Sequence, residues 1–144
     1  MSLAMSKDQR EAFLAATHVG IVGIAEEGRG PVTVPVWYQY EPGGTVRFVT
    51  GKSSKKAEVL QHESRASFCV QTETPPYSYV SIEGPVEVGP CDYEAHIEEM
   101  AIRYLGEELG KAYLEMTHPG GEMGESVLVT ITPKRWWSVD YDKM

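Results

Sequence analysis

Hydrophobic and polar positions alternate over several short stretches of this chain and recur at helical spacing over others. Alternation predicts half-buried strands, whereas apolar residues three and four positions apart predict amphipathic helices. The strand patterns cover residues 19–25, 33–40, 45–50, 66–72, 77–88, 127–132 and 135–141. The helical patterns cover residues 6–16, 54–62, 92–105 and 107–116. Strands outnumber helices, so we predict a mainly β protein of the α+β class.

Local signals refine several of these elements. Ser6–Gln9 has the sequence of a capping box, and Asp92 is a candidate N-cap for a later helix. Pro35 inside the second strand pattern implies an edge or a bulge, and Gly84-Pro85 predicts a break in the long fifth strand. The strands follow one another through hairpins and short crossovers. We therefore predict a split β-barrel of about six to seven mostly antiparallel strands with flanking helices.

Length and composition fit one ordinary globular domain. The chain has 144 residues, of which 42% are hydrophobic and 24% are charged, and we predict a single domain over residues 1–144. Residues 1–5 are expected to be a disordered tail or a remnant of cloning, because Met5 is a suitable natural start. No apolar run approaches the roughly 20 residues of a membrane span, so no membrane partner is expected. The amino terminus lacks a secretory pattern, and we expect a cytoplasmic protein.

Charge and cysteine usage exclude several classes of function. The 13 basic and 21 acidic residues give a net charge of −8, whereas a nucleic-acid binder is normally basic. Cys69 and Cys91 form no CxxC pair and the histidines are scattered, so no metal site is predicted. No set of Ser, His and Asp, or of Cys and His, points to a hydrolase. The sequence therefore leaves the catalytic residues unassigned.

The most informative stretch covers residues 45–60, where a strand pattern enters a turn and a helix pattern follows. Lys55 and Lys56 fall in the first helical turn, although the helix dipole favours anions there. Two lysines are tolerable at this position if an anion lies between them and the free backbone N–H groups. Thr50, Ser53 and Ser54 add hydroxyl donors. We therefore hypothesise a phosphate cradle at this turn.

Two different interpretations compete with the phosphate cradle. If no anion binds, the lysines belong to a solvated surface helix. Gly51-Lys52-Ser53 is similar to the end of a nucleotide P-loop, but that motif needs a glycine where Val46 stands. Residues 46–50 also have a strand pattern and not that of a wrapping loop, which argues against the P-loop.

Aromatic residues are concentrated in or beside the strand patterns, where most of them would fill the barrel core. Trp37 is the best candidate for a wall against a flat ring, because its neighbours face the valine-rich side of the strand. His118 lies in a glycine-rich loop at 117–125, and the sequence leaves open whether this loop closes over a pocket. The acidic residues of the helices between 92 and 116 are predicted to form a solvated face.

Three segments together resemble a known family. They are VTVPVW at 32–37, FVTGKSSKK at 48–56 and SIEGPVEV at 81–88. In order and spacing they are similar to the pyridoxamine 5'-phosphate oxidase-like superfamily of flavin-binding split barrels. The resemblance covers residues 16–88. The carboxyl-terminal part matches only in its strand pattern and in its aromatic end, Arg135-Trp136-Trp137.

The resemblance implies a homodimer that binds FMN in a groove between the subunits and transfers hydride to or from a small-molecule substrate. The basic pair would hold the phosphate, the strand before it would supply backbone and hydroxyl contacts, and the earlier strand would lie along the flavin ring. With the hydroxyl of Ser54 added, the candidate cofactor-binding residues are Val34, Pro35, Val36, Trp37, Val49, Thr50, Ser54, Lys55, Lys56 and Tyr79. Trp136 and Trp137 are hypothesised to cross to the partner subunit and wall its pocket.

The chain also departs from the family's namesake enzymes. True pyridoxamine phosphate oxidases carry an arginine and a lysine around the 32–37 strand and a carboxyl-terminal motif with arginine and histidine. Both are missing from this sequence, which argues against pyridoxamine phosphate as the substrate. A deazaflavin is a second candidate cofactor, because it also ends in a phosphorylated tail. A non-catalytic flavin- or haem-binding module and a structural dimer without a ligand are also compatible with the sequence.

Overall fold

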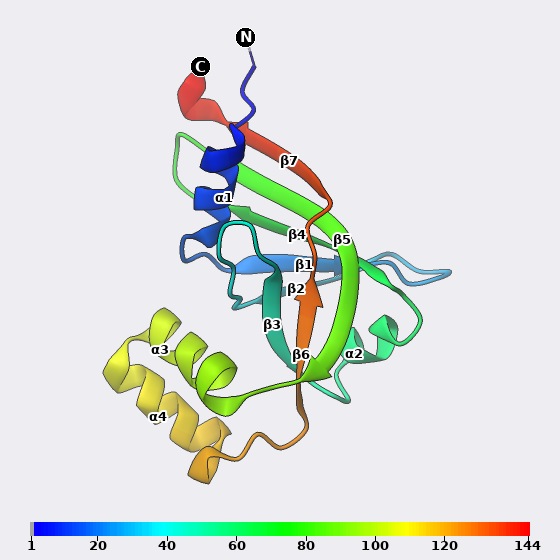
Figure 1. The fold of residues 1–144 in the computed structure, drawn as a ribbon, viewed down its shortest axis with the longest axis vertical. Helices are drawn as coiled ribbons and strands as arrows, with labels where there is room; N and C mark the ends of the chain where they lie inside the picture. The colour runs from blue at the N-terminus through cyan, green and yellow to red at the C-terminus, as the bar shows by residue number, and fades with distance from the viewer. Residues whose placement is uncertain (1) are drawn as a thin grey trace.

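The strands form one antiparallel sheet that curls into a split barrel, in a computed structural model that describes residues 2–144 (Figure 1). The strands are β1 (Gly20–Ile24), β2 (Val32–Val36), β3 (Val46–Gly51), β4 (Arg65–Gln71), β5 (Ser78–Pro90), β6 (Ser126–Ile131) and β7 (Arg135–Asp140). Their order is β2-β1-β4-β5-β6-β3, and β7 pairs with β5. This architecture confirms the predicted fold class.

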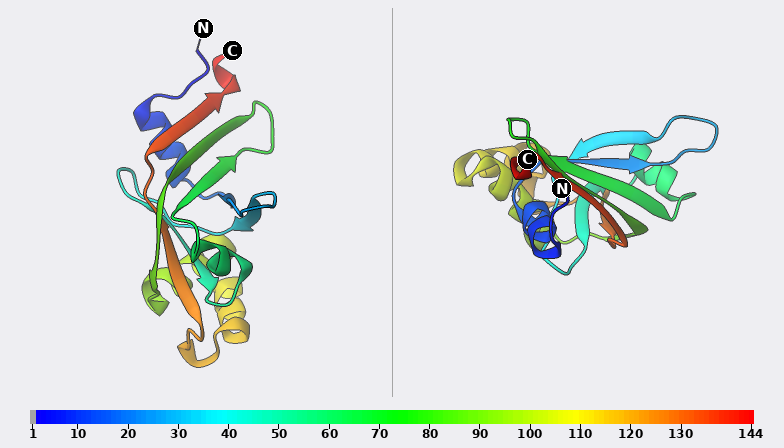
Figure 2. Two further views of the ribbon diagram at one scale, coloured as in Figure 1. Left: turned by 90° about the vertical axis from the view of Figure 1, so that its right-hand side faces the viewer. Right: turned by 90° about the horizontal axis from the view of Figure 1, so that it is seen from above.

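Helices lie at both ends of the curled sheet, and one short helix packs beside it (Figures 1 and 2). They are α1 (Lys7–Ala15), α2 (Lys55–Leu60), the π-helical η1 (Tyr93–Glu98), α3 (Glu99–Leu105), α4 (Glu107–Thr117) and two short 3-10 turns, η2 (Pro119–Gly121) and η3 (Tyr141–Lys143). We call α3 and α4, with η1 before them, the helical hairpin. It lies at the opposite end of the molecule from α1.

The predicted helix signals are present in the structure. Ser6 and Gln9 make both hydrogen bonds of the capping box at the start of α1. The Asp92 side chain accepts a hydrogen bond from the backbone N–H of Ala95, at 2.7 Å, and so caps η1. Gly106 has φ of +86°, which favours glycine, and it separates α3 from α4. The ends of these elements could therefore be predicted from local chemistry.

The second strand is shorter than predicted. β2 ends at Val36, whereas the alternating pattern extends to Tyr40. Tyr38, Gln39 and Tyr40 are all buried, so the segment no longer presents alternate faces to core and solvent. The hydroxyl of Tyr38 donates to the carbonyl oxygen of Leu14 at 2.6 Å, and Gln39 forms an isolated bridge with Arg47. This bridge links the segment after β2 to β3.

The predicted break in the fifth strand is absent. β5 runs without interruption from Ser78 to Pro90 and changes partners at its middle. Residues up to 85 pair with β4 and β7, and residues 86–90 pair with β6. A Cβ atom at Gly84 would lie 1.7 Å from the carbonyl oxygen of Thr132. Glycine is required here because another piece of backbone approaches closely, and the strand bends there without ending.

Residues 3–5 lie against β7 at the end of the molecule where both termini meet (Figure 1). The backbone N–H of Asp140 donates to the carbonyl oxygen of Leu3 at 2.8 Å. The backbone N–H of Met5 donates to the hydroxyl of Ser138 at 3.0 Å, and the Met5 side chain is buried in the barrel core. These contacts were not anticipated from the sequence, because they depend on where β7 lies.

Candidate functional site

A hollow of about 530 Å³ opens between the sheet and the helical hairpin, a volume typical of small-molecule and cofactor sites. Its strand wall is made by Pro35, Val36, Trp37, Val49, Thr50 and Gly51. Its helical wall is made by His96, Ile97, Met100, Tyr113 and His118. Val19, Lys56 and Ser126 complete the lining. Strands β2 and β3 and the helical hairpin are thus brought together here from distant parts of the chain.

The helical hairpin holds Trp37 in place on the strand wall. The Trp37 ring stacks on Tyr104 of α3, with ring centroids 5.1 Å apart and planes 7° from parallel. The ring of Tyr113 of α4 also lies beside Trp37, with a centroid distance of 5.3 Å and planes 53° apart. The hydroxyl of Tyr104 also donates to the carbonyl oxygen of His18 at 2.6 Å. Packing and hydrogen bonding therefore fix the aromatic part of the hollow.

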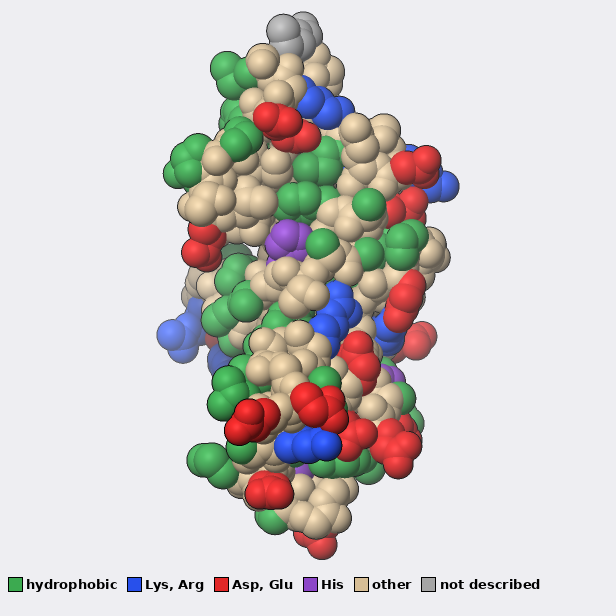
Figure 3. All heavy atoms as spheres, turned by 90° about the vertical axis from the view of Figure 1, so that its left-hand side faces the viewer, with side chains coloured by type: hydrophobic (Ala, Val, Ile, Leu, Met, Phe, Trp, Pro, Cys, Tyr) green, Lys and Arg blue, Asp and Glu red, His purple; other side chains and the backbone are tan. Residues whose placement is uncertain are grey.

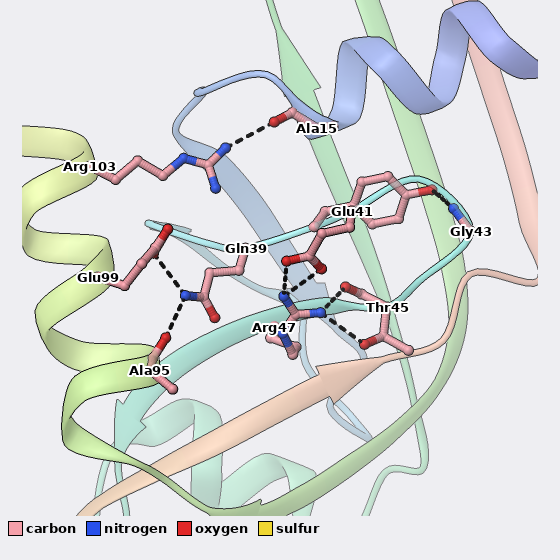
Figure 4. Close-up of polar contacts among 10 residues, drawn as sticks. Ala15, Gln39, Glu41, Gly43, Thr45, Arg47, Ala95, Glu99 and Arg103 are labelled. Atoms are coloured by element: carbon pink, nitrogen blue, oxygen red, sulfur yellow. Dashed lines mark hydrogen bonds and ion pairs between the residues drawn. The ribbon is translucent and has the colours of Figure 1, made fainter.

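Polar contacts attach the helical hairpin to the barrel (Figure 4). The amide nitrogen of Gln39 donates to the carbonyl oxygen of Ala95 at 2.9 Å and to a carboxylate oxygen of Glu99 at 2.8 Å. Arg103 donates to the carbonyl oxygen of Ala15 at 2.9 Å. Gln39 is only 6% exposed. These contacts set the distance between the two walls of the hollow.

The two lysines at the start of α2 point in different directions. The ammonium of Lys55 lies 2.8 Å from a carboxylate oxygen of Glu26 and 3.8 Å from one of Glu58. The hydrogen bond to Glu26 raises the pKa of Lys55. Lys56 lines the hollow instead, and among residues 2–144 no carboxylate lies within 4.0 Å of its ammonium. Partial burial lowers the pKa of Lys56.

The structure brings together some of the predicted cofactor residues and separates others. Pro35, Val36, Trp37, Val49, Thr50 and Lys56 all line the hollow. Val34 packs against the barrel core, and Tyr79 lies on the outer face of β5. The hydroxyl of Ser54 is used inside the protein, because it accepts from the backbone N–H of Ala57 at 3.2 Å and shares a hydrogen bond with Thr50 at 2.9 Å. Lys55 lies beside a second, smaller hollow next to Glu26.

The helical wall had no direct signal in the amino-acid sequence. The spacing of the apolar residues Ile97 and Ala101 indicates which side of the helix is buried, but it does not indicate that this side faces β3. His96, Met100 and Tyr113 were therefore missed. His118 was noted as a loop residue, and the structure places it in the lining.

Acidic side chains cover the outer side of the helical hairpin, as predicted (Figure 3). Glu94, Glu107 and Glu108 are exposed, and Glu99 is exposed although its carboxylate accepts a hydrogen bond from Gln39 on the side that faces the barrel. The lining of the hollow, by contrast, includes a lysine and two histidines and no Asp or Glu among the described residues. The hollow is thus suited to an anionic ligand within an acidic protein.

Metal-binding clusters and membrane-spanning helices are both absent from the described chain. Residues 2–144 contain no group of three or more His, Cys, Asp or Glu side chains that could hold a metal ion. In the same part of the chain, no helix has the length and apolar character needed to cross a membrane.

Comparison with known proteins identifies the family. The family model described as pyridoxamine 5'-phosphate oxidase matches residues 6–140. The chain belongs to this family. No curated protein sequence matches this member of the pyridoxamine 5'-phosphate oxidase family at a significant level.

Solved structures with the same fold include three of interest. A conserved hypothetical protein from Mycobacterium tuberculosis has a TM-score of 0.73 and 24% identity, over 99% of this chain and 89% of that one. An F420 reductase has a TM-score of 0.72 and 20% identity, over 88% of this chain and 94% of that one. A FAD-binding protein from Mesorhizobium loti has a TM-score of 0.65 and 21% identity, over 94% of both chains. At these identities the likeness shows the fold shared within the pyridoxamine 5'-phosphate oxidase family.

Proposed function

We propose that this protein is a flavin-dependent oxidoreductase that binds the phosphate of FMN at Lys56. The observation that carries the proposal is the partly buried Lys56, which faces the hollow without a carboxylate partner in the described chain. Burial disfavours the charged ammonium, and an anion in the hollow would offset that cost. A lysine also suits a phosphate group as a compact cation. Lys55 differs because Glu26 already neutralises it.

The remaining lining residues fit the other parts of FMN. The hydroxyl of Ser126 lies in the same lining as Lys56 and would donate a hydrogen bond to the ligand, whereas the hydroxyl of Thr50 already shares one with Ser54. Val36, Trp37 and Val49 offer apolar surface to a flat ring and exclude water from it. FMN, when bound, would supply the hydride chemistry, and the protein would supply binding, orientation and electrostatics.

A deazaflavin-dependent reductase is the second candidate. It is supported by the structural likeness to an F420 reductase, which covers 94% of that chain. A deazaflavin also carries a phosphorylated tail, so Lys56 would have the same role. Binding of each cofactor is therefore to be measured side by side.

We further propose a homodimer formed through the outer face of the sheet. Ile21, Cys69, Ser81 and Trp137 lie next to one another across β1, β4, β5 and β7. Ile21 is 41% exposed and Trp137 is 51% exposed, and Tyr79 lies on the same face at 37%. The exposed apolar side chains of Ile21, Tyr79 and Trp137 on one face are typical of an interface. Tyr79 and Trp137 would then act at this interface.

The cofactor proposal is tested by titrating FMN into the protein and into two matched variants, Lys56→Ala and Lys55→Ala. We expect about one FMN to bind per chain. Loss of a charge-assisted hydrogen bond should weaken binding to Lys56→Ala by about tenfold or more. Lys55→Ala should change the affinity far less, because Lys55 lies outside the hollow.

Two results would contradict the cofactor proposal. Equal affinities for Lys56→Ala and the unchanged protein would remove Lys56 from the site. A protein that binds neither FMN nor a deazaflavin would leave the fold in place and overturn the proposed activity.

A further inference from the structure

His96 reaches the hollow from η1 with one ring nitrogen already used. The backbone N–H of Asp92 donates to Nδ1 of His96 at 2.9 Å. Because Nδ1 acts as the acceptor, a neutral His96 ring must carry its proton on Nε2. Nε2 makes no hydrogen bond within residues 2–144. His96 therefore offers the hollow a hydrogen-bond donor.

His118 reaches the hollow from the end of α4 with the opposite arrangement. The hydroxyl of Thr117 donates to the carbonyl oxygen of Tyr113 at 2.9 Å, which uses its single proton. Thr117 Oγ1 also lies 2.8 Å from Nδ1 of His118, so Nδ1 must be the donor in that pair. The neutral ring then has an unprotonated Nε2. His118 offers the hollow a hydrogen-bond acceptor.

We propose that His96 and His118 form the substrate-recognition edge of the hollow. His96 donates to an acceptor oxygen of the substrate, and His118 accepts from an N–H or O–H group of the same molecule. Both rings lie on the helical wall, opposite the strand wall that we assign to the flavin. The inference therefore rests on the proposed function and adds to it the class of substrate.

The surroundings of the two rings restrict that class further. Ile97 and Met100, which lie beside His96 in the lining, are apolar, and Tyr113 contributes an aromatic ring. The substrate is therefore a small molecule with an apolar body that carries a carbonyl-type oxygen and an N–H or O–H group. Cyclic amides have this combination. A molecule with acceptors alone would leave His118 without a partner.

The tautomers are tested first, by nitrogen–proton correlation NMR on the intact protein at a pH where histidines are neutral. We expect His96 to be protonated on Nε2 and His118 on Nδ1. The same tautomer in both rings would overturn the inference. This measurement needs neither cofactor nor substrate, so it is independent of whether FMN binds.

Recognition is tested with a matched pair of probes, 2-pyridone and N-methyl-2-pyridone, by following chemical shifts during titration. The N-methyl compound keeps the carbonyl oxygen and lacks the N–H group, so we expect it to bind about threefold more weakly or worse. His118→Leu should abolish the difference between the probes, and His96→Leu should weaken both. The control is His62→Leu, since His62 is exposed and lies outside the hollow.

The outcomes separate this inference from the proposed function. A difference between the probes that persists in His118→Leu would overturn the recognition edge alone. Failure of FMN and deazaflavin binding, with the probe pattern intact, would overturn the proposed activity alone.

Discussion

Gln39 attaches the helical wall of the hollow to the barrel, and its replacement by methionine should loosen that wall. Methionine has a similar length and is apolar, so Gln39→Met removes the two hydrogen bonds to Ala95 and Glu99 while keeping the side chain's bulk. A neutral hydrogen bond contributes about 0.5–1.5 kcal/mol, and one to a charged group contributes more. Because Glu99 is exposed, water will replace part of the hydrogen bonding that its carboxylate loses in this variant.

The expected loss of stability is therefore about 1–3 kcal/mol. For a domain of this size, each kcal/mol corresponds to about 3 °C in Tm, which gives a decrease of about 3–9 °C. Calorimetry measures that decrease, and amide hydrogen exchange should show faster opening of η1 and α3. FMN affinity should also fall at temperatures where the variant is folded, because η1 and α3 form part of the hollow.

The matched control is Gln61→Met, since Gln61 is exposed at the end of α2. Its Tm should change by less than about 1 °C, as is usual for surface substitutions. If Gln39→Met left both the Tm and the hydrogen exchange of η1 and α3 unchanged, Gln39 would not hold the helical wall.

Three further residues, Gly84, His18 and Trp137, lead to predictions of their own. Gly84→Ala should lower the Tm strongly, because its methyl group would strike a backbone carbonyl oxygen 1.7 Å away, and a Tm within about 1 °C of the parent would contradict this close approach. Burial lowers the pKa of His18, and the positive charge of Arg103 lowers it a little further. The unfolded chain therefore binds a proton at His18 more readily than the folded protein does, so the stability of the fold should fall as the pH drops below 6.5. His18→Gln should flatten that part of a curve of Tm against pH, and an unchanged slope would exclude His18 as its cause. Trp137→Asp should convert the proposed dimer to monomer in sedimentation and make Cys69 react faster with a thiol reagent, whereas an unchanged mass would argue against this interface.

Most of the fold could be predicted because its signals are local. Alternation located all seven strands, and the capping residues Ser6 and Asp92 located the starts of two helices. The errors arose where tertiary contacts override the pattern. β2 ends early because three consecutive residues after it are buried, and β5 continues because Gly84 allows it to bend.

The candidate site was only partly predictable for the same reason. The strand wall follows from the motif around Pro35 and from the strand before α2, both of which are continuous in sequence. The difference between Lys55 and Lys56 depends on Glu26, which lies in the turn after β1 and has no sequence relationship to α2. The hydrogen-bonding roles of His96 and His118 depend on neighbouring backbone and hydroxyl groups, which cannot be placed without coordinates.

The pairing of β3 has a consequence for the order of folding. β3 pairs with β6, so that Val46 meets Ile131 near the end of the chain, whereas β1, β2, β4 and β5 pair among themselves earlier. A pairing between distant residues must first overcome the entropy of closing the intervening loop, and it forms late. During synthesis, β3 has to wait for β6 to emerge from the ribosome. The wall that carries Val49 and Thr50 is therefore among the last parts of the domain to form, and a nascent chain that lacks β6 has no complete hollow.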